Sequence, residues 1–142
     1  MSAKKVNNIE IREITADQTW DLRHRVMYPN EPFESIKLSD DVEGVHFGLF
    51  KNNRLVSVVS LFVRNNEVQF RKLATEVDEQ KNGHGTKLIL FILEYAIKIQ
   101  ASRIWCNARE NKAYFYEKFG LQATNKTYFQ TGIKFVVMEK IV

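Results

Sequence analysis

The chain has 142 residues, and its hydrophobic fraction of 44% and charged fraction of 27% are ordinary for a globular protein. This length suffices for one buried core, and the composition excludes disordered and membrane-embedded classes. Lys and Arg outnumber Asp and Glu by 21 to 17, but they are scattered, without the basic cluster typical of nucleic-acid binding. We therefore expect one domain over residues 1–142, with residues 1–8 flexible and no nucleic-acid partner.

Targeting signals are not evident in this sequence. The longest apolar run, Leu88–Leu93, is too short to span a bilayer. Met1–Lys5 is followed by the polar residues Asn7 and Asn8, where a signal peptide would continue with apolar residues. The one cysteine, Cys106, rules out an internal disulfide framework. We expect a cytoplasmic protein without a membrane partner.

The N-terminal part predicts a strand and then a helix. Ile9–Ile14 alternates apolar and charged residues imperfectly, as a short strand does. Thr15 is a residue type that caps helices, and we expect the helix after it to reach about Met27. Pro29 and Pro32 then end it.

The segment after these prolines predicts a loop, Tyr28–Asp41, with at most a short helical piece around Glu34–Leu38. Loops of this length are often functional.

Three strands follow in the sequence: Gly44–Phe50, Arg54–Val63 and Glu67–Thr75. They are separated by the pairs Asn52-Asn53 and Asn65-Asn66. Asparagine tolerates the positive φ that tight hairpin turns need, so we predict an antiparallel meander.

A strongly apolar helix is predicted from Gly83 to Gln100, with a narrow polar stripe at Lys87, Glu94 and Lys98. Such a helix must pack on a sheet. The pattern of Arg103–Asn107 predicts a buried strand. A strand, this helix and a second strand make a crossover connection, which predicts a parallel strand pair.

The C-terminal part predicts a helix, Lys112–Phe119, that stops at Gly120. Leu121–Gln130 and Ile133–Ile141 then form a hairpin around Thr131-Gly132. The expected fold is α+β, a mixed and mostly antiparallel sheet of about six to seven strands with flanking helices.

A glycine-rich segment, Gln80-Lys81-Asn82-Gly83-His84-Gly85-Thr86, lies between a strand and the first turn of a helix. Unpaired backbone N–H groups and the helix dipole favour an anion at such a place. A P-loop is excluded because the order is Gly85-Thr86-Lys87, and the Rossmann fingerprint fails because Leu88 stands where it needs glycine. A pyrophosphate fits the segment, although two glycines can also serve only to shape a tight turn.

Two motifs together resemble the GNAT superfamily of N-acetyltransferases. QKNGHGTKL is similar to the Q/R-x-x-G-x-G/A loop that binds the pyrophosphate of acetyl-CoA, and NARENKAYFYEKFGL is similar to the second signature of that superfamily. The resemblance in element order covers most of the chain, and the residue-level similarity covers roughly Phe70–Leu121. It implies an acyl-CoA-dependent N-acetyltransferase with acetyl-CoA as co-substrate and an amine acceptor, on a small molecule or a peptide.

The resemblance also implies site residues. The fourth and fifth strands would splay apart around the pantetheine arm, which would pair with backbone groups of Leu73 and Thr75. The side chain of Gln80 and the N–H groups of the following residues would bind the pyrophosphate, and Asn107 would lie near the arm. The residues that supply these N–H groups are Lys81, Asn82, Gly83, His84, Gly85 and Thr86. The commonest form of this loop is Gln-Gly-Lys-Gly-x-Gly. Lys81 and Asn82 stand here in place of its Gly-Lys pair, so the loop keeps one positive charge.

Tyr116 matches the tyrosine that protonates the leaving thiolate in this superfamily. A phenol of pKa near 10 gives its proton to a thiolate of pKa near 8.5 at a cost of about 2 kcal/mol, so hydrogen bonding is as important as transfer. A tyrosine that only packs its helix is the structural alternative.

A general base is harder to find. The position that we align with the catalytic glutamate of some relatives is Gln69, which cannot take a proton. Neutralising a lysine-like amine at pH 7 costs about 4.6 kcal/mol, and an α-amine only about 1.4 kcal/mol, so water suffices for a weakly basic acceptor. Glu34 and His46 are the alternative bases.

The remaining polar residues support weaker hypotheses. Some of the cations could orient an anionic acceptor, although most are expected to be solvated: Arg23, His24, Arg25 and Arg71. The three histidines and Cys106 show no metal-ligand spacing, and we expect Cys106 to be buried and inert. A non-catalytic acyl-CoA-binding sensor or interaction domain is the alternative function, and a homodimer remains open.

Overall fold

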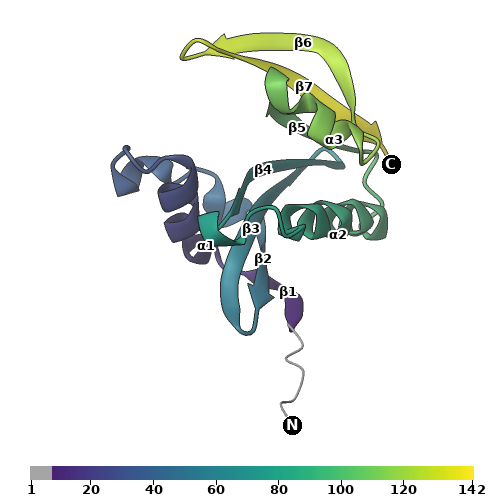
Figure 1. Cartoon of the computed structure of the whole chain (residues 1–142). Helices are drawn as coiled ribbons and strands as arrows, with labels where there is room; N and C mark the ends of the chain where they lie inside the picture. Colours follow the sequence, from purple (N-terminus) through teal and green to yellow (C-terminus); the bar gives the residue numbers. More distant parts are fainter. Residues whose placement is uncertain (1–7) are drawn as a thin grey trace. The chain divides into compact units, whose positions relative to one another are not determined.

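The computed structural model describes residues 8–142 and builds them mainly from strands (Figure 1). The strands are β1 Ile9–Ile14, β2 Val45–Lys51, β3 Arg54–Arg64, β4 Glu67–Thr75, β5 Arg103–Arg109, β6 Gln122–Gln130 and β7 Ile133–Ile141. The α-helices are α1 Ala16–Leu22, α2 His84–Lys98 and α3 Ala113–Glu117. The predicted flexibility of residues 1–8 lies outside the described part except at Asn8, whose backbone N–H donates to Asn52 Oδ1 at 3.0 Å.

The seven strands are ordered β1-β2-β3-β4-β5-β7-β6 in one sheet. β4 and β5 pair in parallel, whereas β1 with β2, β5 with β7, and β6 with β7 pair antiparallel. The mixed, mostly antiparallel sheet expected from the sequence is therefore confirmed. The parallel register covers three residues of each strand and ends at Gln69 opposite Trp105.

The described residues form two compact units. One unit holds the described chain up to Ser60 together with Lys72–Leu88, and the other holds Leu61–Arg71 and Ile89–Val142. β3, β4 and α2 each begin in one unit and end in the other. The expectation of a single domain stays a prediction. Within residues 8–142, no helix is both long and apolar enough to cross a membrane.

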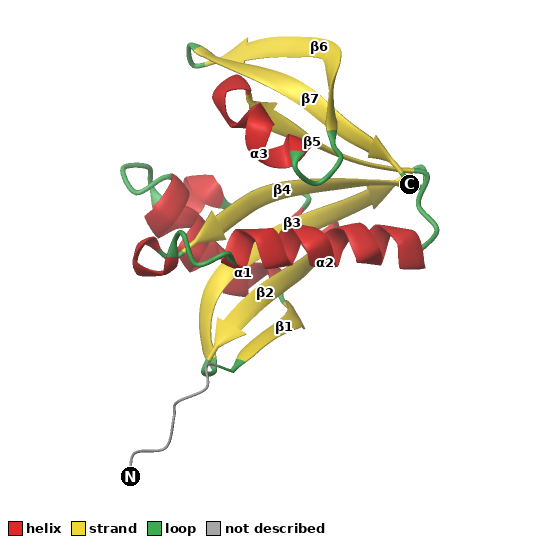
Figure 2. Cartoon of the chain, turned by 45° about the vertical axis from the view of Figure 1, so that its right-hand side comes forward, coloured by secondary structure: helices red, strands yellow, loops and turns green. Residues whose placement is uncertain are grey.

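The tight turns have the backbone geometry that their residues predict. Asn52 and Asn53 have φ values of 51° and 67°, and Asn65 and Asn66 have 52° and 62°. Gly120 follows α3 at φ 89°. The β6–β7 turn, visible at one end of the hairpin in Figure 2, lies at residues 131 and 132 with φ values of 48° and 77°. The predicted hairpins are therefore confirmed.

Two helices differ in detail from the predictions. The helix expected to reach Met27 does so, but it continues from α1 as a π-helix over Arg23–Met27. The helix expected at Lys112–Phe119 is shorter, because Lys112 is the last residue of a 3-10 helix, Glu110–Lys112, and α3 ends at Glu117. The short helical piece of the loop is a 3-10 helix at Phe33–Ile36.

A buried ion pair anchors the loop between the first helix and β2. Arg23 is fully buried, and its Nη1 lies 2.8 Å from Asp41 Oδ2. The same guanidinium donates to the carbonyl of Ile36 at 3.1 Å and to Ser60 Oγ at 3.0 Å. His46 continues this network, with Nδ1 2.7 Å from Ser60 Oγ and Nε2 2.8 Å from the carbonyl of Asp41. Arg23 is therefore structural and is not available to orient an acceptor.

The Asp41 carboxylate depends on these donors. Burial would raise its pKa, but hydrogen bonds from Arg23, from the Leu38 backbone N–H and from Trp20 outweigh this and lower the pKa. Its stabilising contribution is present above the unfolded pKa and is lost as pH falls through the folded pKa.

We predict that Arg23→Met lowers the free energy of unfolding by about 3–5 kcal/mol, because it leaves Asp41 buried without a cation. Urea unfolding at pH 7 measures this change. Arg23→Met with Asp41→Leu should recover much of the loss, because both charges are then removed.

The matched control is the exposed pair of Lys37 with Glu34, whose atoms are 2.9 Å apart. Glu34→Gln should cost no more than about 1 kcal/mol. Equal losses for Glu34→Gln and Arg23→Met would contradict the structural role of the buried pair.

Candidate functional site

The glycine-rich loop joins the 3-10 helix Val77–Glu79 to the start of α2. The Lys87 N–H donates to the Gly83 carbonyl at 3.1 Å, so the helical hydrogen bonds begin there. The N–H groups of the residues just before Lys87 precede that first bond and are available to a ligand. The structure therefore places the predicted anion-binding N–H groups at the N-terminus of a 15-residue helix.

The two glycines of the loop have different roles. Gly83 has φ +80°, in the left-handed region that favours glycine. Gly85 lies in the first turn of α2, and a Cβ there would meet only Leu73 Cδ2, at an ordinary 3.8 Å. Packing against the described residues therefore does not require glycine at position 85.

The side chain of Gln80 holds the loop against the end of β4. Its Nε2 donates to the Thr75 carbonyl at 3.1 Å, and Thr75 Oγ1 lies 2.8 Å from Ser57 Oγ. Leu73 and Thr75 are half-buried, and Lys81 is exposed. The Gln80 amide thus bonds to a backbone group that the resemblance gives to the pantetheine arm.

A carboxylate that the sequence analysis missed organises this loop. Glu79 Oε1 accepts from Lys51 Nζ at 3.1 Å and from Asn82 Nδ2 at 3.2 Å, and it lies 3.0 Å from His84 Nε2. The hydrogen bond from His84, followed by that from Lys51, lowers the pKa of Glu79 to about 2. Glu79 is ionised at any ordinary pH, so Asn82 and His84 bind it through their side chains. No periodic pattern or motif in the sequence pairs these residues.

Tyr116 lies on α3 and is half-buried. Its ring centroid is 5.7 Å from that of Phe70. Burial raises the pKa of the phenol, and the nearby Cys106 raises it further. Among the described residues, the phenol has no hydrogen-bond partner. Tyr116 is thus a neutral hydroxyl that can donate a hydrogen bond, and it is a weaker acid than an ordinary tyrosine.

The two β5 residues singled out from the sequence differ in exposure. Asn107 is exposed, opposite Val137 in the register with β7. Cys106 is only 3% exposed, and burial raises the pKa of its thiol to about 12. The expectation that Cys106 is buried is confirmed, and its thiolate form is rare at neutral pH.

The candidate bases are engaged in other contacts. Glu34 is exposed and pairs with Lys37, and both ring nitrogens of His46 lie within hydrogen-bonding distance of buried oxygens. Gln69 is half-buried on β4.

Near the middle of β4, Lys72 has φ 59° and its Nζ lies 2.6 Å from Tyr28 Oη, a pair that sequence reasoning also missed.

The other predicted cations are held by local contacts. Arg25 pairs with Asp21 at 2.8 Å and with Glu76 at 2.7 Å. His24 Nε2 lies 2.7 Å from the carbonyl of Glu31. Arg71 lies over the ring of Phe62, with 5.4 Å from its Cζ to the centroid.

The sequence and the fold both match known acetyltransferases. A family model described as an acetyltransferase (GNAT) domain matches residues 11–142. The uncharacterized N-acetyltransferase YitI of Bacillus subtilis is 27% identical over 142 residues, which cover 93% of this chain and 95% of that protein.

Solved structures share the fold. A GNAT family acetyltransferase of Elizabethkingia anophelis with acetyl-CoA bound has a TM-score of 0.74 at 16% identity, over 95% of this chain and 99% of that one. A Bacillus subtilis acetyltransferase in complex with CoA has a TM-score of 0.70 at 22% identity, over 96% of this chain and 99% of that one. With the family model covering nearly all of the described residues, the chain belongs to the GNAT family of acetyltransferases.

Proposed function

We propose that this protein transfers the acetyl group of acetyl-CoA to an amine of a small molecule or peptide by direct attack. The C–N bond forms as the C–S bond breaks, the amine loses a proton, and the CoA thiolate gains one. The family match over residues 11–142 supports this class of reaction. The observation that carries the proposal is the start of α2, where unpaired N–H groups adjoin the open backbone of Gly85.

The loop at the start of α2 is proposed to hold the pyrophosphate of the co-substrate. The N–H groups of His84, Gly85 and Thr86 would donate to phosphate oxygens, and the helix dipole favours their negative charge. Lys81 is exposed and adds a positive charge beside them. We also propose that backbone groups of Leu73 and Thr75 orient the pantetheine arm.

Tyr116 is proposed to assist departure of the thiolate. Its phenol is neutral at pH 7, as an ordinary tyrosine is, its pKa is raised further by burial, and it has no competing partner among the described residues. The raised pKa makes full proton transfer costlier than the roughly 2 kcal/mol of an ordinary tyrosine. A hydrogen bond to the developing negative charge on sulfur is therefore the main contribution that we assign to it.

The acceptor is proposed to be a weakly basic amine. Gln69 cannot act as a base, and Glu34 and His46 are held in the contacts described above. An amine of pKa near 8 loses its proton at pH 7 at a cost of about 1.4 kcal/mol, against about 4.6 kcal/mol for a lysine-like amine. Water can therefore deprotonate an amine of pKa near 8 without the help of a strong base.

We predict that Gly85→Val weakens CoA binding at least about tenfold and leaves folding nearly unchanged. The added side chain would occupy the space beside the backbone, where a Cβ would meet Leu73 Cδ2 at 3.8 Å and, apart from its own helix, no other atom of the described residues within 4 Å. Calorimetry gives the affinity, and urea unfolding checks the fold. Gly85→Ala should show a smaller effect in the same direction. An unchanged CoA affinity in folded Gly85→Val would remove the pyrophosphate from this loop.

We predict that Tyr116→Phe lowers turnover on the order of 100-fold and leaves CoA affinity unchanged, because only one proton donor is lost. Calorimetry and thiol release measure the two effects on the same preparation. Tyr114→Phe is the matched control, because Tyr114 lies on the same helix and is 62% exposed. Undiminished turnover in Tyr116→Phe would exclude Tyr116 from the mechanism, and parallel losses of affinity and stability would indicate a packing role.

We expect thiol release from acetyl-CoA when a panel of amines is offered at pH 7, with α-amines and other weakly basic amines reacting fastest. Cys106 should not disturb this measurement, because its thiol is buried and its pKa is about 12. Binding of acetyl-CoA without turnover of any amine would instead favour a non-catalytic acyl-CoA sensor.

A further inference from the structure

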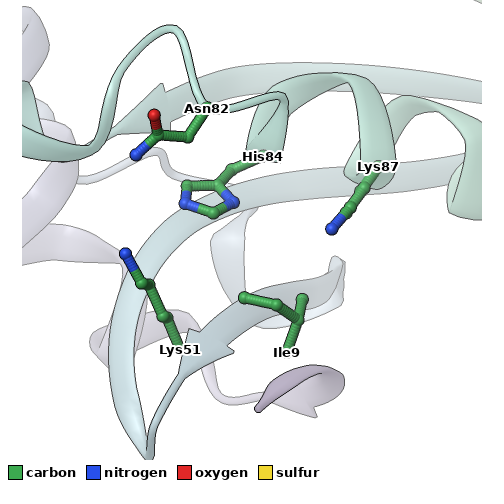
Figure 3. Close-up of a pocket in the computed structure, with 5 residues that line it drawn as sticks. All are labelled: Ile9, Lys51, Asn82, His84 and Lys87. Carbon is green, nitrogen blue, oxygen red and sulfur yellow. The ribbon is translucent and has the colours of Figure 1, made fainter. Parts of the chain in front are cut away.

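A pocket lies where β1 and the end of β2 face the start of α2 (Figure 3). It is lined by Ile9, Lys51, Asn82, His84 and Lys87, and its volume is about 410 Å³. All five residues belong to the same compact unit. This volume is within the range of small-molecule sites and far exceeds that of one water molecule. Ile9 supplies an apolar wall, so the pocket suits a small organic group that carries a charge.

The polar lining of the pocket has a net positive charge. Lys51 pairs with Glu79, and this carboxylate neutralises part of the positive charge of the lining. Glu79 does not itself line the pocket. Lys87 is exposed and has no ion-pair partner in the described part of the chain. The N-terminal end of α2 adds positive potential. An anion is therefore favoured over a cation here.

His84 provides an independent sign of a missing partner. The side chain is 4% exposed, its Nε2 lies 3.0 Å from Glu79 Oε1, and its buried Nδ1 has no hydrogen-bond partner among residues 8–142. Because ionised Glu79 can only accept, Nε2 carries the proton of that bond. Figure 3 shows the ring between Lys51 and Lys87. Buried polar atoms without partners are rare and require an explanation.

We propose that this pocket binds a phosphate monoester, held by Lys87, by Lys51 and by the His84 ring. A phosphate group beside Lys87 would supply the partner that His84 Nδ1 lacks, by accepting from a protonated ring or by donating its own hydroxyl. Lys87 and the N-terminal end of α2 supply the positive charge that Glu79 does not neutralise, and a phosphate group has enough acceptor oxygens to contact Lys87, Lys51 and the ring together.

Two sources of this chemistry are available, the 3′-phosphate on the ribose of CoA and free phosphate. The assignment of the pocket to the 3′-phosphate of CoA rests on the proposed function. It is supported by Asn82 and His84, which belong both to the pocket and to the loop proposed for the pyrophosphate. One ribose separates the pyrophosphate from the 3′-phosphate in CoA, and Ile9 would contact the carbon atoms of that ribose.

The test compares calorimetric affinities for CoA, for 3′-dephospho-CoA and for inorganic phosphate, in the wild type and in Lys87→Gln. We expect the wild type to bind CoA about tenfold more tightly than dephospho-CoA, because a charge-assisted contact is lost with the phosphate. Lys87→Gln should remove this preference and leave the affinity for dephospho-CoA unchanged. Lys98→Gln, the same change in the last turn of α2, is the control and should keep the preference.

The outcomes separate the two sources and the two proposals. Equal binding of CoA and dephospho-CoA, with inorganic phosphate bound in a Lys87-dependent manner, would support the phosphate site with free phosphate as its source. Identical behaviour of the wild type and Lys87→Gln toward all three ligands would overturn the site. Failure of both CoA forms to bind would count against the proposed function, and the phosphate titration would still decide on the pocket.

Discussion

The carboxylate of Glu79 is the contact on which the geometry of the glycine loop depends. It binds side chains from the end of β2, from the loop and from the first residue of α2, namely Lys51, Asn82 and His84. These bonds fix the beginning of the helix through side chains and leave the backbone N–H groups there for a ligand. A negative charge near a helix N-terminus also stabilises the helix. The same charge would repel an anion, and the surrounding lysines offset that repulsion.

The two proposed anion sites use different groups at the N-terminus of α2, backbone groups in one and side chains in the other. The loop site depends on the backbone, where Gly83 permits a left-handed φ and Gly85 places no side chain beside the N–H groups. The pocket depends on side chains, since its polar lining comes from Lys51, His84 and Lys87 together with Asn82. Substitution of a lysine should therefore affect the pocket without changing the backbone conformation of the loop. The two contributions are separable by experiment for that reason.

The fold could be predicted from the sequence more completely than the site could. Strands and hairpins follow from local patterns, such as Asn52-Asn53 and Asn65-Asn66, whose positive φ values match the turns predicted for them. Helix ends are less certain, because α3 competes with a 3-10 turn over only a few residues. The loop at residues 80–86 was evident from its glycines. The contacts of Glu79 were not evident, because Lys51 lies 28 residues away in the sequence and no motif marks the nearby Asn82 and His84 as partners of this carboxylate.

The fates of the cations show why charge in a sequence does not identify a binding residue. Arg23 is one of the cations that, from the sequence, either orient an acceptor or are solvated, but its guanidinium is wholly buried against Asp41 and serves the fold. Lys51 is committed in part to Glu79, whereas Lys87 has no acidic partner in the part of the chain that the structure describes. A cation already paired at full burial gains little from a ligand, because its desolvation has been offset within the protein. An exposed cation beside a pocket, in contrast, can pair with an incoming anion. The environment of each lysine and arginine therefore decides where anions bind, and the formal net charge of +4 does not.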